Sequence, residues 1–165
     1  MTSSRFGGLL LLVATLLCAC AVPPHKPARP AGTAQDFWTG RLSLRIQSEP
    51  PQSLATQFEL SGNAQTGKLQ LTSPLGNTLV SMQWGPGSAL LQRSGERQQF
   101  GSLDELTQSL TGSALPIEAL FEWLRGQAVS VPGWSVDLSQ LQQGRLLARQ
   151  LPPAIPAELR LIIEP

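Results

Sequence analysis

The side chain with the most distinctive chemistry in this 165-residue sequence is the thiol of Cys20. It ends the tetrapeptide Leu17-Cys18-Ala19-Cys20, which follows a short polar start and the apolar run Leu9–Leu17. A polar start, an apolar stretch and a small-residue cleavage site are the layout of a secretory signal peptide. The tetrapeptide also resembles a bacterial lipobox at all four positions. We therefore expect residues 1–19 to be removed as a lipoprotein signal peptide and the Cys20 thiol to carry lipid.

The alternative is ordinary signal-peptide cleavage that leaves Cys20 as an incidental thiol. A membrane-spanning helix is disfavoured because the apolar run is shorter than the roughly 20 residues needed to cross a bilayer. Prolines at positions 23 and 24 would also stop a helix. Cys18 would leave with the signal, so a lipidated chain would keep no free thiol for a disulfide. Ala21, where an aspartate favours inner-membrane retention, resembles the outer-membrane type of lipoprotein.

Residues that could perform catalysis are sparse in the rest of the sequence. The single histidine, His25, lies among prolines, where it would lack the fixed orientation that a Ser-His-Asp unit needs. The sequence contains no Gly-x-Ser-x-Gly elbow, no phosphate-binding glycine loop and no Cys-His cluster with zinc spacing. The nearest carboxylate pairs, Asp104 with Glu105 and Glu118 with Glu122, fit a helix cap and a solvated helix face. We expect neither an enzyme nor a cofactor or metal site.

Composition and charge narrow the possible partners. The chain has 12 basic and 11 acidic side chains, and the formal charge of +1 without any basic run disfavours a nucleic-acid partner. Charged residues make up 14%, below the roughly 25% typical of soluble domains. Residues 20–35 are rich in proline and lack apolar periodicity, which predicts a semi-extended tether after the lipidated cysteine. Residues 36–165 are long enough for one domain.

The elements of this domain follow from two hydrophobic periods. Alternation of apolar and polar residues predicts half-buried antiparallel strands. These strands are expected within residues 40–46, 54–60, 68–72, 78–84, 89–92, 98–100, 134–138, 145–148 and 158–163.

Two helices are expected between the sixth and seventh of these strands. Ser102-Leu103-Asp104-Glu105 has the form of a capping box, with Glu105 able to reach back, and Gly112 is a plausible stop. A second helix is expected to open near Pro116 and to end at Arg125-Gly126. An antiparallel sheet with helices on its apolar face is an α+β arrangement. The space between them could be a packed core or a cavity, since both require the same alternating residues.

One turn has an unusual residue at its tip. In Thr72-Ser73-Pro74-Leu75-Gly76-Asn77, the positions of Ser73, Pro74 and Gly76 fit a type I turn. Leu75 then occupies a tip that normally carries a polar residue. Its simplest explanation is packing against a neighbouring strand, and the alternative is a functional contact.

Several segments together resemble the LolB family of outer-membrane lipoprotein receptors. The resemblance covers nearly the whole expected domain and rests on the lipobox, Trp38–Arg45, Leu71–Thr78, the Leu115-Pro-Ile segment and Leu120–Gly126. It implies an incomplete antiparallel β-barrel whose concave apolar face is covered by helices. It also implies a receptor that accepts lipoproteins from the periplasmic carrier LolA, holds their acyl chains and inserts them into the outer membrane. In the family, the leucine of the Pro-Leu-Gly turn promotes insertion, which implies a membrane-insertion loop of Pro74, Leu75 and Gly76.

If the resemblance holds, acyl chains would occupy a cavity lined by apolar side chains of the sheet and of the second helix. The expected lining residues are Leu42, Leu44, Ile46, Phe58, Leu69, Leu71, Val80, Met82, Trp84, Leu120, Phe121 and Trp123. We expect a monomer that is lipid-anchored to the outer membrane of a Gram-negative bacterium and faces the periplasm, with LolA, lipoprotein acyl chains and outer-membrane lipid as partners. The main alternative is a lipoprotein scaffold of an envelope complex, with a filled core and no acyl-chain binding. A surface-anchored hydrolase is a more distant alternative.

Overall fold

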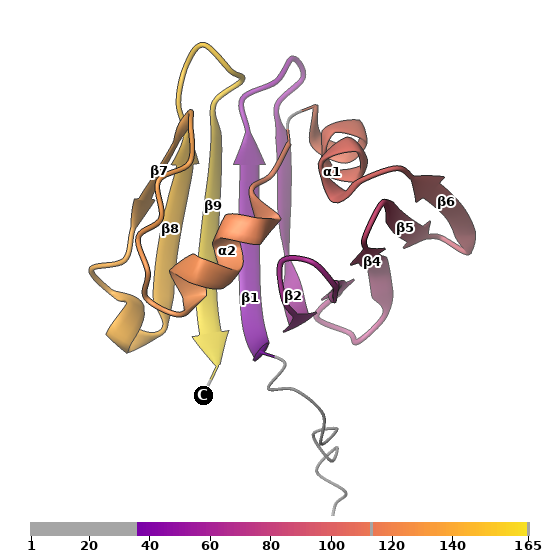
Figure 1. Ribbon diagram of the computed structural model, residues 1–165, viewed down its shortest axis with the longest axis horizontal. Helices are drawn as coiled ribbons and strands as arrows, with labels where there is room; N and C mark the ends of the chain where they lie inside the picture. Colours follow the sequence, from indigo (N-terminus) through magenta and orange to yellow (C-terminus); the bar gives the residue numbers. More distant parts are fainter. Residues whose placement is uncertain (1–35, 113, 165) are drawn as a thin grey trace, which may run out of the picture. The chain divides into compact units, whose positions relative to one another are not determined.

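The computed structural model describes residues 36–112 and 114–164, which form one antiparallel sheet partly covered by helices (Figure 1). The expected signal peptide, the lipidated Cys20 and the tether with His25 lie outside the described residues. The nine strands of the sheet are β1 (Asp36–Ile46), β2 (Gln52–Gly62), β3 (Gly67–Thr72), β4 (Thr78–Gly85), β5 (Ser88–Arg93), β6 (Glu96–Phe100), β7 (Trp134–Asp137), β8 (Arg145–Gln150) and β9 (Ala157–Glu164).

The sheet is open, because the edge strands β6 and β7 of the described residues do not pair with each other. The order is β6-β5-β4-β3-β2-β1-β9-β8-β7, and every neighbouring pair is antiparallel. The last strand β9 pairs with the first strand β1 in the middle of the sheet. The predicted fold class, an α+β fold with an incomplete antiparallel barrel, is confirmed.

The alternation read from the sequence describes the strands well. Leu42, Leu44 and Ile46 of β1 are buried, while Arg41 and Arg45 between them are exposed. The first strand starts four residues earlier than predicted, at Asp36. Its carboxylate accepts a hydrogen bond of 2.9 Å from Nε of Arg125, which ties the start of β1 to the end of the second helix. This hydrogen bond is the largest of the interactions that raise the pKa of Arg125.

One predicted strand is shorter than expected. The strand predicted to run through Leu138 ends at Asp137. The Asp137 carboxylate accepts a 2.9 Å hydrogen bond from the backbone N–H of Ser139, a local turn that competes with further strand pairing. Hydrogen bonds from Ser139 also lower the pKa of Asp137.

Both predicted helices are present, α1 (Leu103–Thr111) and α2 (Ile117–Leu124), and a short 3-10 helix, η1 (Leu141–Gln143), precedes β8. Ser102 caps α1 as predicted, since its hydroxyl accepts from the backbone N–H of Glu105 at 3.1 Å. The Glu105 carboxylate accepts from the N–H of Gly101, one residue before the position that a capping box would use. Gly112 ends α1 with φ +74°, a conformation that glycine adopts without strain.

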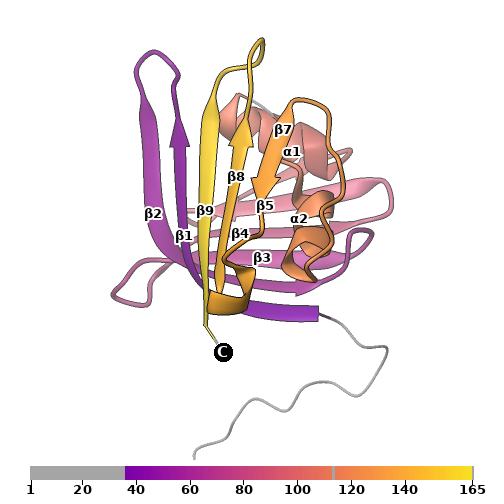
Figure 2. The same cartoon turned by 90° about the vertical axis from the view of Figure 1, so that its left-hand side faces the viewer.

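The sheet bends strongly, so that its halves face each other around the helices. Figure 2 shows β1 and β2 turning from the orientation of β8 and β9 into that of β3, β4 and β5, with both helices inside the bend. Gly40 of β1 has φ +154°, and a Cβ there would lie 1.9 Å from the carbonyl oxygen of Ile162 in β9. The pairing of β1 with β9 therefore includes a close backbone approach that only glycine allows.

Replacing Gly40 with alanine should accordingly destabilise the domain. We expect Gly40→Ala to lower the free energy of unfolding by roughly 3 kcal/mol, the upper end of the range for a methyl group forced into a packed site. Gly85→Ala is the matched control, because a Cβ at Gly85 meets nothing within 4 Å. Urea unfolding followed by circular dichroism measures both variants. Equal stability of the two would contradict the role given to Gly40.

Candidate functional site

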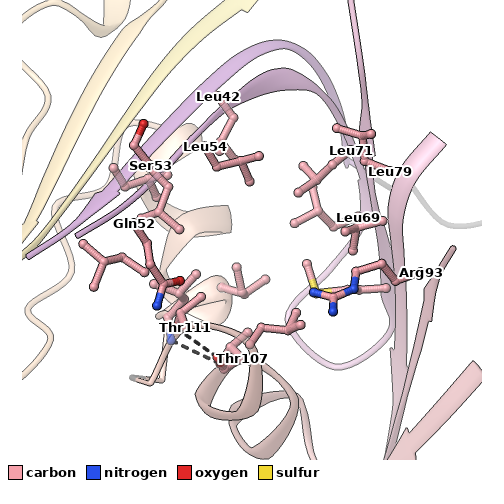
Figure 3. Close-up of a pocket in the computed structure, with 18 of the residues that line it drawn as sticks. Leu42, Gln52, Ser53, Leu54, Leu69, Leu71, Leu79, Arg93, Thr107 and Thr111 are labelled. Carbon is pink, nitrogen blue, oxygen red and sulfur yellow. Dashed lines mark hydrogen bonds between the residues drawn. The ribbon is translucent and has the colours of Figure 1, made fainter. Parts of the chain in front are cut away.

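An apolar cavity lies between the inner face of the sheet and the two helices. Its volume is about 410 Å³, within the range of about 300–1,000 Å³ that small-molecule sites occupy in proteins. Side chains from β1, β2, β3, β4, β5, β9, α1 and α2 line it, and most of them are aliphatic (Figure 3). The sequence left open whether this space is a packed core or a cavity. The structure contains both, side by side.

Eight of the twelve residues predicted to line an acyl cavity surround this space. They are Leu42, Leu44, Ile46, Leu69, Leu71, Val80, Met82 and Leu120. These side chains form an apolar environment without directed polar contacts, and such an environment suits a flexible hydrocarbon ligand.

The other four predicted residues lie in the packed core and do not line this cavity: Phe58, Trp84, Phe121 and Trp123. Phe121 is fully buried, and its ring meets Trp38 and Trp84 edge to face at centroid distances of 5.6 and 6.1 Å. The Trp123 indole donates a 3.0 Å hydrogen bond to the carbonyl of Val129. Large rings thus fill the space beneath the middle of α2, and the unfilled space lies toward α1.

Several lining residues were not predicted as such. Leu54, Leu110 and Ile117 line the cavity. All three lie on apolar faces that the sequence pattern indicates, so their periodicity could have identified them. Leu115 and Leu159 complete the aliphatic lining from the loop before α2 and from β9.

Leu79 lines the cavity for a reason that the sequence does not reveal. Alternation in β4 puts Val80 and Met82 inside and would put Leu79 outside. The register with β3 shifts, because Leu71 pairs with Val80 and Thr72 pairs with Thr78. Leu79 is thereby the extra residue of a β-bulge, which re-aims side chains. It borders the cavity beside Leu71 while remaining 38% exposed (Figure 3).

The turn Ser73–Asn77, which leads from β3 into this bulged strand, holds an exposed leucine in a defined frame. The carbonyl of Ser73 accepts from the N–H of Gly76 at 2.9 Å, and the Ser73 hydroxyl accepts from the N–H of Asn77 at 3.2 Å. Leu75 at the tip is 89% exposed, which excludes the simple explanation that it packs against a neighbouring strand. Only Thr78 separates Asn77 from Leu79, so the loop adjoins the cavity.

Polar groups near the cavity have partners or lie at its mouth. The Thr107 hydroxyl, in a residue only 1% exposed, donates to the carbonyl of Asp104 and accepts from the N–H of Leu115, both at 3.1 Å. These bonds fix the connection between α1 and α2. Within residues 36–112 and 114–164, no buried side-chain nitrogen or oxygen lacks a hydrogen-bond partner.

One carboxylate of each pair considered in the sequence takes part in a structural interaction. Glu105 caps α1, and Glu122 forms an ion pair with Arg125. The described part of the chain contains no group of three His, Cys, Asp or Glu side chains arranged to hold a metal ion. Among the described residues, neither helix is long and apolar enough to cross a membrane.

Comparison with known proteins points to one family. Residues 37–152 match the family model described as outer membrane lipoprotein LolB. The chain is 33% identical over 127 residues to the outer-membrane lipoprotein LolB of Bordetella pertussis, covering 74% of this chain and 62% of that protein. Identity to LolB of Chromobacterium violaceum is 30% over 122 residues, covering 72% and 66%. Identity to LolB of Yersinia pseudotuberculosis is 27% over 150 residues, covering 83% and 72%. The chain thus spans less than two thirds of the Bordetella relative.

The division between packed core and cavity predicts different costs for two truncations. Phe121→Ala should lower the free energy of unfolding by about 3–5 kcal/mol, because a fully buried ring between two indoles is lost. Val80→Ala should cost roughly 1 kcal/mol or less, because Val80 is half-buried and already borders empty space. Chemical denaturation of both variants tests this. A cost for Val80→Ala as large as that for Phe121→Ala would mean that the cavity is filled in solution.

Proposed function

Because this chain belongs to the LolB family of outer-membrane lipoproteins, we propose that it is an outer-membrane receptor for lipoproteins. It accepts them from the periplasmic carrier LolA, holds their acyl chains in the apolar cavity and inserts them into the outer membrane. The observation that carries this proposal is the cavity of about 410 Å³ beside an exposed leucine turn. A scaffold without acyl-chain binding would need no such unfilled space.

Energetics favour a cavity for this task. Each buried methylene of an acyl chain is stabilised by about 0.8 kcal/mol, so a bare lipoprotein tail needs shielding outside a membrane. The aliphatic lining supplies that shielding without directed contacts, which lets one site accept many cargoes through their common acyl groups. Transfer then requires only that the receptor site is more favourable than the carrier, and release requires that the bilayer is more favourable still.

Leu75 acts in the last step by entering the lipid interface. Burying a leucine side chain is favourable by about 1.5–3 kcal/mol, enough to hold the turn transiently against a bilayer. Leu79 extends the apolar surface from the Leu75 turn to the cavity, since it borders the cavity and is also exposed. An acyl chain leaving the cavity past Leu79 would stay in contact with apolar side chains until it reached the membrane.

The lipid anchor places this domain at its site of action. Cys20 carries the lipid, and more than one acyl chain gives a stable attachment. Residues 20–35, at up to about 3.1 Å per residue in an extended proline-rich form, give the domain reach from the bilayer. The anchor and the tether lie outside the described residues and are part of this proposal.

Cargo capture is the first test. A soluble chain beginning at Ala21 is mixed with LolA loaded with a lipoprotein, and pull-down locates the cargo. We expect the cargo to move to this chain, and Val80→Trp, which adds an indole to the cavity, to capture several-fold less. Cargo that stays on a transfer-competent carrier would favour the scaffold alternative and would refute the receptor proposal.

Delivery should depend on Leu75 separately from capture. Leu75→Glu is expected to capture cargo normally and to release about tenfold less of it into liposomes, because a charge disfavours entry into the interface. Ile155→Glu is the matched control, since Ile155 is a 41% exposed apolar residue in another turn. Unchanged delivery by Leu75→Glu, measured by flotation of liposomes with labelled cargo, would show that the turn is not the insertion loop.

A further inference from the structure

Arg93 occupies a position in β5 where an apolar residue would continue the inner face. Ala89 and Leu91 alternate along that face and are buried, and Arg93 is the next residue in the same alternation. In the register with β4 it lies opposite Val80, which also lines the cavity. A charged side chain therefore ends an otherwise apolar row.

The arginine lies at the mouth of the cavity. Arg93 lines the apolar cavity and also the neighbouring, more polar pocket that contains Glu96 and Arg97. Figure 3 shows its guanidinium extending into the space from the side opposite Gln52 and Ser53. The side chain is exposed, so its aliphatic stem borders the cavity while its charge reaches the solvent boundary.

The guanidinium has no partner within residues 36–112 and 114–164. Glu96 lies directly opposite Arg93 across the β5–β6 turn, yet no ion pair joins the two. Arg125, Arg149 and Arg160, in contrast, all pair with carboxylates. The donors of Arg93 are therefore available at the only charged position along the lining of the cavity described above.

We propose that Arg93 and the cavity form a binding site for a single-chain anionic amphiphile, with the alkyl chain among the leucines and a carboxylate or phosphate head on the guanidinium. An apolar cavity with one polar anchor fixes both the position and the orientation of such a ligand. Arginine presents a planar fork of donors that matches carboxylate and phosphate oxygens bidentately. The proposal rests on the cavity of the proposed function but does not depend on transfer of lipoprotein cargo.

A simpler role for Arg93 makes a different prediction. If the stem only covers the rim and the charge only faces water, alkyl ligands would bind by chain length alone. Neutral and anionic heads would then be equivalent. The comparison between a charged and an uncharged head on the same alkyl chain therefore isolates the contribution of Arg93.

The test uses displacement of the neutral fluorescent dye N-phenyl-1-naphthylamine from the soluble chain beginning at Ala21, which retains every described residue. The competitors are dodecanoate, dodecyl phosphate and dodecanol, each below its aggregation limit. We expect the anionic competitors to displace the dye at about tenfold lower concentration than dodecanol, with a preference that shrinks at high salt. Comparison of dodecanoate with dodecyl phosphate distinguishes a fatty-acid head from a phospholipid-type head.

Variants assign this preference to one residue. Arg93→Gln should abolish the preference without changing displacement by dodecanol, and Arg93→Lys should retain part of it. Arg45→Gln, which removes another exposed charge, this one from the outer face of β1, should behave like the parent chain. A parent chain without preference, or a preference that survives Arg93→Gln, would overturn this inference and leave the cavity intact. If none of the three competitors displaced the dye, both this inference and the proposed role of the cavity would be overturned.

Discussion

The constraint on which the structure depends is that the two helices are too short to cover the whole apolar face of the sheet. The bent sheet turns leucines from five strands toward the cavity, but α1 and α2 have only 9 and 8 residues. Aromatic rings fill the space under α2, where Phe121 packs edge to face with Trp38 and Trp84. Protein interiors normally reach crystal-like density. None of the residues that line the cavity is aromatic, and its mostly aliphatic side chains leave the space unfilled.

Local physical rules explain why so much of this fold could be predicted from the sequence. Period-two alternation requires no knowledge of distant residues, so most of the strands follow from their own side chains. The edge strand β6 is the exception, because its first four residues are polar and exposed and only Phe100 is half-buried. The cap at Ser102 and the stop at Gly112 are likewise local, and both are present. The exposed tip at Leu75 follows from a turn whose residues specify its backbone hydrogen bond. Short stretches of sequence therefore specify most of the strands and both helices.

The division between cavity and core could not be predicted, because it depends on volumes that several elements fill together. Phe58 and Leu69 have the same alternating pattern and the same 3% exposure, yet only Leu69 borders the cavity. Leu79 escaped prediction because a register shift with β3, rather than its own sequence, turns it toward the cavity. Arg93 had no distinguishing signal, since an arginine near a hairpin end is ordinary until its surroundings are known.

Under the proposed function, the same constraint links the storage of a ligand to its release. A fully packed interior would hold no acyl chain, and a deeply closed cavity would bind one too tightly to hand it on. Here the cavity mouth includes Leu79 of a bulge and Arg93, which has no ion-pair partner in the part of the chain that the structure describes, and the Leu75 turn lies within a few residues of that bulge. A single exposed leucine means little by itself. Here its turn is hydrogen-bonded into place, and Leu79, four residues further along the chain, borders the apolar cavity.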